Sequence, residues 1–261
     1  MPIVTLISDW GSKDHYTASV KGAILKRDPS ITIVDISHHV EAFNIPQASF
    51  ILRNAYPDFP DGTVHMVAIN TDESEQTPHL AIFHNGHYFI GTDNGIFPLL
   101  FDGMPEKMIE IEIPQDTDYF TFSARDRFVS AAVHLLHGKS IEDLGFIRTG
   151  LIELHNFRPV LQPSLIIGKI IYIDCYENAI TNISEKVFRE IGKNKSFTIQ
   201  LRSLAHRVKK IPTSYHDVIE STIVVLFGTT GMLEIAINQG NAASLLGLSV
   251  DDFIRIEFDD K

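Results

Sequence analysis

The chain opens with the stretch IVTLISDWGSKDHY, residues 3–16, and this stretch decides the fold. It begins as a short apolar run that suits a buried strand and ends in a polar turn carrying two carboxylates, Asp9 and Asp14. A helical pattern follows at once, with one face formed by Tyr16, Val20, Ala23, Ile24 and Arg27. A strand, an acidic turn and a helix in this order are typical of an open α/β sheet, where ligands bind at the carboxyl ends of the strands.

The acidic turn leaves two interpretations open. In the first, Asp9 and Asp14 face the ligand crevice at the end of the strand. The turn lacks the G-x-G-x-x-G spacing of a phosphate cradle, so its carboxylates suit sugar hydroxyls or a positively charged ligand. In the second, Asp9 caps the helix and Asp14 is solvated. The spacing alone does not decide between them.

The composition excludes several classes of protein. The 261 residues suit one large domain or two modest ones, and 44% hydrophobic residues are enough for real cores. A formal net charge of −11 argues against a nucleic-acid partner, because phosphate neutralisation needs clustered Lys and Arg. The lone Cys175 excludes an internal disulfide and suits a reducing compartment. With neither a signal peptide nor a membrane span in the pattern, we expect a cytoplasmic protein with no membrane partner.

Twelve histidines raise the question of a metal site. His38 and His39 are adjacent after an expected strand, so their side chains point in opposite directions. His84 and His87 flank an expected hairpin turn, and no H-x-x-x-H or Cys/His pair is present. We therefore expect no metal.

The order of elements predicts two domains, residues 1–160 and 161–261. The first alternates strands and helices, with a helix starting at Asn44-Ile45-Pro46 and a hairpin around Asn85-Gly86. A proline-bounded linker at 159–163 follows. Beyond it, strands dominate, expected at 165–174, 197–204, 223–227, 232–237 and 253–258, with helices only near 185–191 and 242–246. The fold class is therefore an α/β domain followed by a β-barrel or sandwich.

Seven short motifs, in this order and spacing, carry a resemblance to a known family. They are Ser8-Asp9-Trp10-Gly11, Val34-Asp35-Ile36-Ser37-His38, Gly62-Thr63-Val64-His65, Asp93-Asn94-Gly95, Thr121-Phe122-Ser123-Ala124-Arg125-Asp126, Ile173-Asp174-Cys175-Tyr176-Glu177-Asn178 and Leu233-Glu234-Ile235-Ala236-Ile237-Asn238. The sequence resembles the S-adenosyl-L-methionine (SAM) hydroxide adenosyltransferases, adenosine-forming SAM hydrolases related to the bacterial fluorinase and chlorinase. The resemblance covers nearly the whole chain.

The resemblance implies a Rossmann-like N-terminal domain, a C-terminal β-barrel and a homotrimer with its ligand sites between subunits. It implies SAM as substrate or ligand, with no other cofactor. The implied contacts are to the ribose (Asp9, Phe43), to the methionine end (Asp14, Asp174), near the carboxylate (Thr229, Thr230) and to adenine (Tyr176, Asn178, Tyr215). Trp10 is implied to bind the ligand as well.

The implied chemistry is a displacement at the ribose 5′ carbon, where a neutral thioether leaves a sulfonium. An aligned, desolvated nucleophile is needed rather than an acid. In the hydrolases of this family, an Asp-Arg-His triad orients water or hydroxide. The matching positions carry Asn70, His79 and Ser123. The halogenating branch does not fit either, because Ala124 occupies its halide pocket and its extra loop is missing.

A replacement for the triad is present nearby, since Asp72 or Glu73 with His79 and Arg125 are all expected near the mouth of the crevice. The alternative is that this acidic loop is simply solvated. We expect a SAM-binding protein that hydrolyses SAM to adenosine and methionine at a variant site. The alternatives are a catalytically silent binder or sensor of adenosine or SAM, and a structural oligomer with a vestigial pocket.

Overall fold

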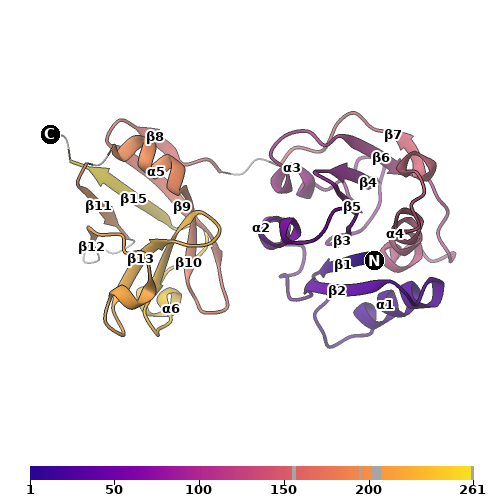
Figure 1. The fold of residues 1–261 in the computed structure, drawn as a ribbon, viewed down its shortest axis with the longest axis horizontal. Helices are drawn as coiled ribbons and strands as arrows, with labels where there is room; N and C mark the ends of the chain where they lie inside the picture. Colours follow the sequence, from indigo (N-terminus) through magenta and orange to yellow (C-terminus); the bar gives the residue numbers. More distant parts are fainter. Residues whose placement is uncertain (155–156, 194, 202–206, 260–261) are drawn as a thin grey trace. The chain divides into compact units, whose positions relative to one another are not determined.

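The computed structural model describes residues 1–154, 157–193, 195–201 and 207–259. The chain divides into two compact units, Met1–His155 and Asn156–Lys261 (Figure 1). The boundary predicted from the sequence, between residues 160 and 161, falls slightly beyond this division. No helix within the described ranges is long and apolar enough to cross a membrane.

Unit 1 is built on a seven-stranded sheet in the order β2-β1-β3-β5-β4-β6-β7. Strands β2, β1, β3 and β5 run parallel, and β4, β6 and β7 continue the sheet in antiparallel pairs. The strands are β1 (Ile3–Ser8), β2 (Thr32–Ser37), β3 (Val64–Ala68), β4 (His79–His84), β5 (His87–Thr92), β6 (Lys107–Ile111) and β7 (Gly145–Ile147). The helices are α1 (Tyr16–Arg27), α2 (Ile45–Ala55), α3 (Ile96–Leu100) and α4 (Val129–Leu136).

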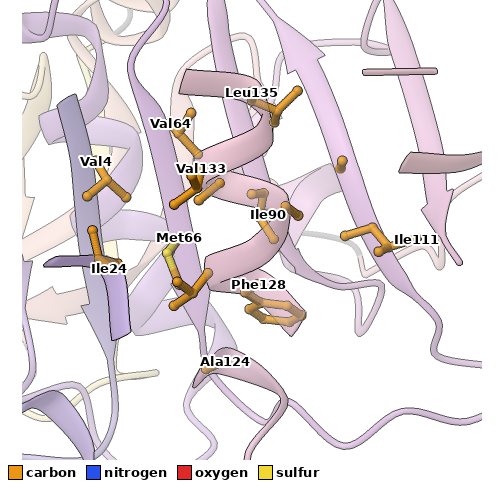
Figure 2. Close-up of a cluster of buried hydrophobic side chains, with 14 of the residues drawn as sticks. Val4, Ile24, Val64, Met66, Ile90, Ile111, Ala124, Phe128, Val133 and Leu135 are labelled. Atoms are coloured by element: carbon orange, nitrogen blue, oxygen red, sulfur yellow. The ribbon is translucent and has the colours of Figure 1, made fainter. Parts of the chain in front are cut away.

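Helices cover both faces of this sheet because the parallel strands are apolar on both sides. On one face, Val4, Met66 and Ile90 of the sheet pack against α1 and α4 (Figure 2). The contacts on the α4 side come from Phe128, just before the helix, and from Val133 within it. On the other face, a second cluster packs under α2 and α3 and is formed by Ile7, Val67, Ile69, Leu80, Ile82 and Phe89 of the sheet with Ala48, Leu52, Ile96, Phe97 and Leu100 of the helices. Each valine, leucine, isoleucine, methionine or phenylalanine side chain among them stabilises the fold by about 1.5–3 kcal/mol on burial.

The local signals in unit 1 are confirmed. The side chain of Asn44 accepts a hydrogen bond from the Gln47 N–H and caps α2, with proline in the first turn. Asn85 and Gly86, both with positive φ, close the hairpin between β4 and β5. The start of α4 departs from a regular α-helix. Residues Ala124–Phe128 form a π-helix before α4 begins, a wider turn that hydrophobic spacing does not reveal.

Unit 2 is an antiparallel, barrel-like sheet in the order β12-β11-β15-β9-β10-β14-β13, with β8 paired to β9. Its strands are β8 (Val160–Gln162), β9 (Leu165–Ile173), β10 (Ala179–Ser184), β11 (Phe197–Gln200), β12 (Arg207–Val208), β13 (Ile223–Phe227), β14 (Met232–Ile237) and β15 (Phe253–Phe258). Helices α5 (Glu185–Gly192) and α6 (Ala242–Leu246) lie where they were predicted. Strand β10 was not predicted, and residues 202–204 of the strand predicted at 197–204 lie outside the described residues.

Candidate functional site

The turn after β1 is tied to the loop after β2 through Asp9. Its Oδ2 accepts a hydrogen bond of 2.9 Å from the backbone N–H of Phe43. Helix α1 begins after His15 and has no side-chain cap, so Asp9 is not the helix cap that one interpretation of the sequence allowed. The Oδ1 atom of Asp9 makes no hydrogen bond with any described residue, which leaves one carboxylate oxygen open to a ligand.

His38 supports the same turn from below. Its carbonyl accepts a 2.7 Å hydrogen bond from Gly11, whose positive φ favours glycine. Its ring joins two further residues, with Nδ1 2.6 Å from Ser8 Oγ and Nε2 3.0 Å from Asp35 Oδ1. Partial burial alone would raise the pKa of Asp35, but hydrogen bonds from Lys21 and His38 hold it below its ordinary value. The turn that carries Asp9 is thus braced by β1 and β2 together.

Three aromatic rings form one wall beside this turn. Phe122 packs edge-on against Trp10 and Tyr16, with ring centroids 5.5 and 5.3 Å apart. Phe43 stands out from the loop after β2, 69% exposed and at a positive φ of 65°. Asp14 is also exposed and makes no hydrogen bond or ion pair with a described residue. Asp9, Trp10, Asp14 and Phe43 are the ligand-binding residues predicted in this region. Among the described residues, contacts hold the side chains of Asp9 and Trp10 in place.

The three positions that match the family triad are not joined to one another by hydrogen bonds within the described structure. Asn70 has φ of 47°, a conformation that asparagine tolerates, and its carbonyl accepts from Asn94 Nδ2 at 3.2 Å. Ser123 is buried, and its Oγ accepts from Gln115 Nε2 at 3.5 Å. His79 is fully buried at the start of β4. None of the three has the setting of an exposed base.

A carboxylate, an imidazole and a guanidinium do meet beside these positions. Arg127 Nη1 donates to Glu73 Oε1 at 2.5 Å and lies 3.2 Å from His79 Nδ1. His79 Nε2 donates to the Thr71 carbonyl at 2.9 Å, so in a neutral ring Nδ1 is the acceptor for Arg127. Burial, assisted by the charge of Arg127, lowers the pKa of His79, although Thr71 and Glu73 act in the opposite direction. The imidazole is therefore neutral at neutral pH.

Arg127 replaces Arg125 in the set that the sequence suggested. Arg125 turns away and forms a two-pronged ion pair with Asp126, with bonds of 2.5 and 2.7 Å, above the ring of Phe122. The sequence Arg125-Asp126-Arg127 offers two arginines that could pair with the acidic loop. The π-helix conformation of this segment directs Arg127 to Glu73.

Unit 2 contains a cavity of about 830 Å³. Its wall includes five residues predicted to bind the ligand, namely Asp174, Tyr176, Asn178, Tyr215 and Thr229. Thr230, predicted with them, is not part of this wall. The volume lies in the range of small-molecule sites, which is about 300–1,000 Å³.

Asp174 shapes the rim of the cavity. Its Oδ1 accepts from the backbone N–H groups of Tyr176 and Asn178, and its Oδ2 accepts from Asn178 Nδ2 at 3.0 Å. Glu177, between them, takes a positive φ of 62°. The turn exposes 73% of Tyr176 and holds the amide of Asn178 in one orientation, so an aromatic face and an amide point from the same rim.

Glu234 on β14 is a cavity residue that the sequence reasoning missed. Leu233 and Ile235 point into the barrel core, so Glu234 points to the opposite face, where Tyr215 donates a 2.5 Å hydrogen bond to its Oε1. Burial, with the nearby charge of Asp174, raises the pKa of Glu234 against the effect of the tyrosine bond. Burial and the hydrogen bond to Glu234 likewise raise the pKa of Tyr215. A charged residue inside an apolar strand was the signal available.

Both units match one family. The chain matches the SAM hydroxide adenosyltransferase N-terminal domain over residues 4–145 and the C-terminal domain of the same family over residues 168–255. The protein belongs to the SAM hydroxide adenosyltransferase family.

Two SAM hydrolases are similar to it over nearly the whole chain. It is 28% identical to the (R)-S-adenosyl-L-methionine hydrolase of Methanocaldococcus jannaschii over 98% of this chain and 96% of the relative. It is also 28% identical to the hydrolase of the same name from Thermus thermophilus, over 97% of this chain and 98% of the relative. A conserved protein of Thermotoga maritima has the same fold, with a TM-score of 0.88 and 29% identity over 97% of this chain and 99% of that one. It is 33% identical to the fluorinase of an Actinoplanes species over 63 residues, which are 24% of this chain and 21% of the relative.

Proposed function

We propose that the protein binds SAM and hydrolyses it to adenosine and L-methionine by displacement at the ribose 5′ carbon. The observation that carries the proposal is the cavity in unit 2, whose aromatic and amide groups match the faces and edge of a purine. It lies in a chain whose full-length relatives are named SAM hydrolases. In the reaction, the water oxygen bonds to C5′ while the C5′–S electron pair passes to sulfur, and one proton is released.

The proposed contacts divide by chemistry. Tyr176 and Tyr215 stack on the purine, and the oriented amide of Asn178 pairs with its edge. The open Oδ1 of Asp9 accepts from the ribose hydroxyls, a charge-assisted bond that is stronger than a neutral one. We assign Trp10 and Phe43 to the surroundings of the ribose.

The remaining assignments concern the methionine end of the ligand. Asp14 and Asp174 are proposed to face its α-ammonium group, and Thr229 and Thr230 its carboxylate. The homotrimer stays a prediction, and light scattering that gives about 88 kDa, three times 29.3 kDa, would support it.

The test is direct. Purified protein is incubated with SAM, and adenosine and methionine are followed by chromatography. We expect both products in equal amounts, and no 5′-halogenated adenosine when chloride or fluoride is added. Titration calorimetry with SAM and with adenosine runs in parallel, so that binding and turnover are measured separately.

A silent nucleoside or SAM binder is the second candidate, and Asn70 and Ser123 favour it. An amide takes no proton from water, and a serine hydroxyl is no base near neutral pH. In this case calorimetry would show nucleoside binding while chromatography showed no product above the uncatalysed rate. Absence of both would leave only a vestigial pocket.

A further inference from the structure

The contacts of Glu73 divide unevenly between its two oxygens. Oε1 receives the hydrogen bond from Arg127 Nη1 and lies 3.6 Å from His79 Nδ1. Oε2 has no hydrogen-bond partner among the residues that the structure describes. The side chain is 33% exposed, whereas those of Arg127 and His79 are 12% and 0% exposed. A partly exposed carboxylate is therefore held through Oε1 by two more deeply buried groups, and its Oε2 is left without a hydrogen-bond partner among the described residues.

The two buried groups are fixed in turn. The neutral ring of His79 is held by the carbonyl of Thr71 through Nε2 and packs edge-on against Phe128, so its Nδ1 offers Arg127 a fixed acceptor. Arg127 Nη1 is then shared between a nitrogen and Glu73 Oε1, which restricts the orientation of the guanidinium. A surface ion pair between two mobile side chains would leave the Glu73 rotamer free, but here Oε1 meets a guanidinium that is itself held by a fixed ring.

The group stands at the edge of the sheet where Asp9 stands. His79 pairs with Thr92, the last residue of β5, and Asp9 follows the last residue of β1, which runs parallel to β3 and β5. Phe122 packs against Trp10, and the π-helix that begins two residues later carries Arg127. The contact between Glu73 and His79 and the turn that carries Asp9 therefore lie at the same edge of the sheet in unit 1.

We propose that Glu73 is the general base that accepts the proton of the attacking water, and that Arg127 and His79 are its positioning residues. The inference rests on the proposed hydrolysis. As the water oxygen bonds to C5′, the C5′–S bond breaks, its electron pair neutralises the sulfonium, and Glu73 Oε2 takes one proton and later releases it to solvent. The sum is SAM and water giving adenosine, methionine and one proton.

This assignment accounts for the changed triad positions. The resemblance placed the arginine near residue 79 and the histidine at residue 123. The structure has the histidine at residue 79 and an arginine on the π-helix after residue 123. The carboxylate moves from position 70 to position 73. The same three kinds of group meet. The histidine now comes from the start of β4, and the arginine comes from the π-helix after residue 123.

The experiment compares turnover and binding in five proteins. The parent, Glu73→Gln and Glu73→Asp carry the test. Glu75→Gln is the matched control, because Glu75 is exposed on the same loop and has no hydrogen bond with a described residue. Asp72→Asn tests the other carboxylate. SAM hydrolysis is measured under single-turnover conditions, SAM affinity by calorimetry, and folding by circular dichroism.

We expect Glu73→Gln to lower the hydrolysis rate about 10²–10⁴-fold with SAM affinity unchanged within threefold, because a base acts on the rate and not on ribose or adenine binding. Glu73→Asp should recover part of the rate, and Glu75→Gln should equal the parent. If the parent hydrolyses SAM and the rate of Glu73→Gln lies within threefold of the parent rate, the inference is overturned and the proposed function stands. The same holds if Asp72→Asn is the change that lowers the rate. A parent that binds SAM without turnover overturns both. A merely structural role would lower affinity and stability together in Glu73→Gln and Glu73→Asp, which also contradicts the inference.

Discussion

Replacing Asp9 tests the N-terminal half of the proposed site. Asp9→Asn is the informative change, because the asparagine carbonyl can still accept from the Phe43 N–H and preserve the turn. Its amide nitrogen cannot accept from the ribose hydroxyls. A hydrogen bond to a charged group contributes about 1.5–3 kcal/mol, and Asp9 is only partly buried, so we take one such bond near the lower end, about 1.5 kcal/mol. That corresponds to about 10-fold weaker binding of adenosine.

The assay is calorimetric titration with adenosine, and with 2′,3′-dideoxyadenosine as a second ligand. The dideoxy compound lacks the hydroxyls, so it should bind the parent and Asp9→Asn equally weakly. Asp9→Ala should lose somewhat more, since the Phe43 N–H also loses its acceptor. Adenosine binding to Asp9→Asn within twofold of the parent would refute the ribose contact and leave Asp9 as a tie between two loops.

Three further outcomes are expected. Tyr215→Phe should lower the free energy of urea unfolding by about 1–3 kcal/mol, because Glu234 loses its donor while buried, whereas Glu234→Gln should cost less. The pKa of His65 is lowered to about 3 by burial and by the charge of His87, so the folded state binds fewer protons than the unfolded state below pH 6.5. Stability is therefore complete above pH 6.5 and falls toward pH 3, by about 2 kcal/mol at pH 5 for this residue, and His65→Gln should remove that part of a denaturation series. Ser123→His should destabilise the fold by about 1–3 kcal/mol in thermal melting and add no turnover, since the site is buried and already filled; a folded Ser123→His protein with faster hydrolysis would contradict the assignment of the base to Glu73.

Local signals predicted the parts of the fold that local chemistry determines. The apolar run at residues 3–8, the Asn44 cap and the Asn85-Gly86 turn each specify their own conformation, and each formed as predicted. Strand β10, residues Ala179–Ser184, was missed because polar Thr181 and Asn182 interrupt its apolar pattern, and its pairing with β9 and β14 is what makes it a strand. Tertiary context overrides the local preference there.

The site was less predictable than the fold because it depends on the direction in which each side chain points from its helix or turn. Positions 125 and 127 lie about 200° apart on a regular helix, so a sequence offers either arginine to the loop before β4. The π-helix sets Arg125 on Asp126 and Arg127 on Glu73. In the same way, Glu234 became a cavity residue only because the segment containing Tyr215 lies over β14.

Matching positions one by one to a triad assumes that each role stays with its place in the chain. Here the buried settings of His79 and Ser123 argue against that assumption, because a base must reach water and neither side chain does. What water activation requires is a carboxylate oxygen that water can reach, oriented by donors that are themselves held in place. Glu73 meets the first condition and the Arg127–His79 contact meets the second. The chemistry therefore constrains which groups are needed, a carboxylate with an arginine and a histidine, and how they are arranged. The fold offers several neighbouring positions for them, at the end of β3, the start of β4 and the π-helix.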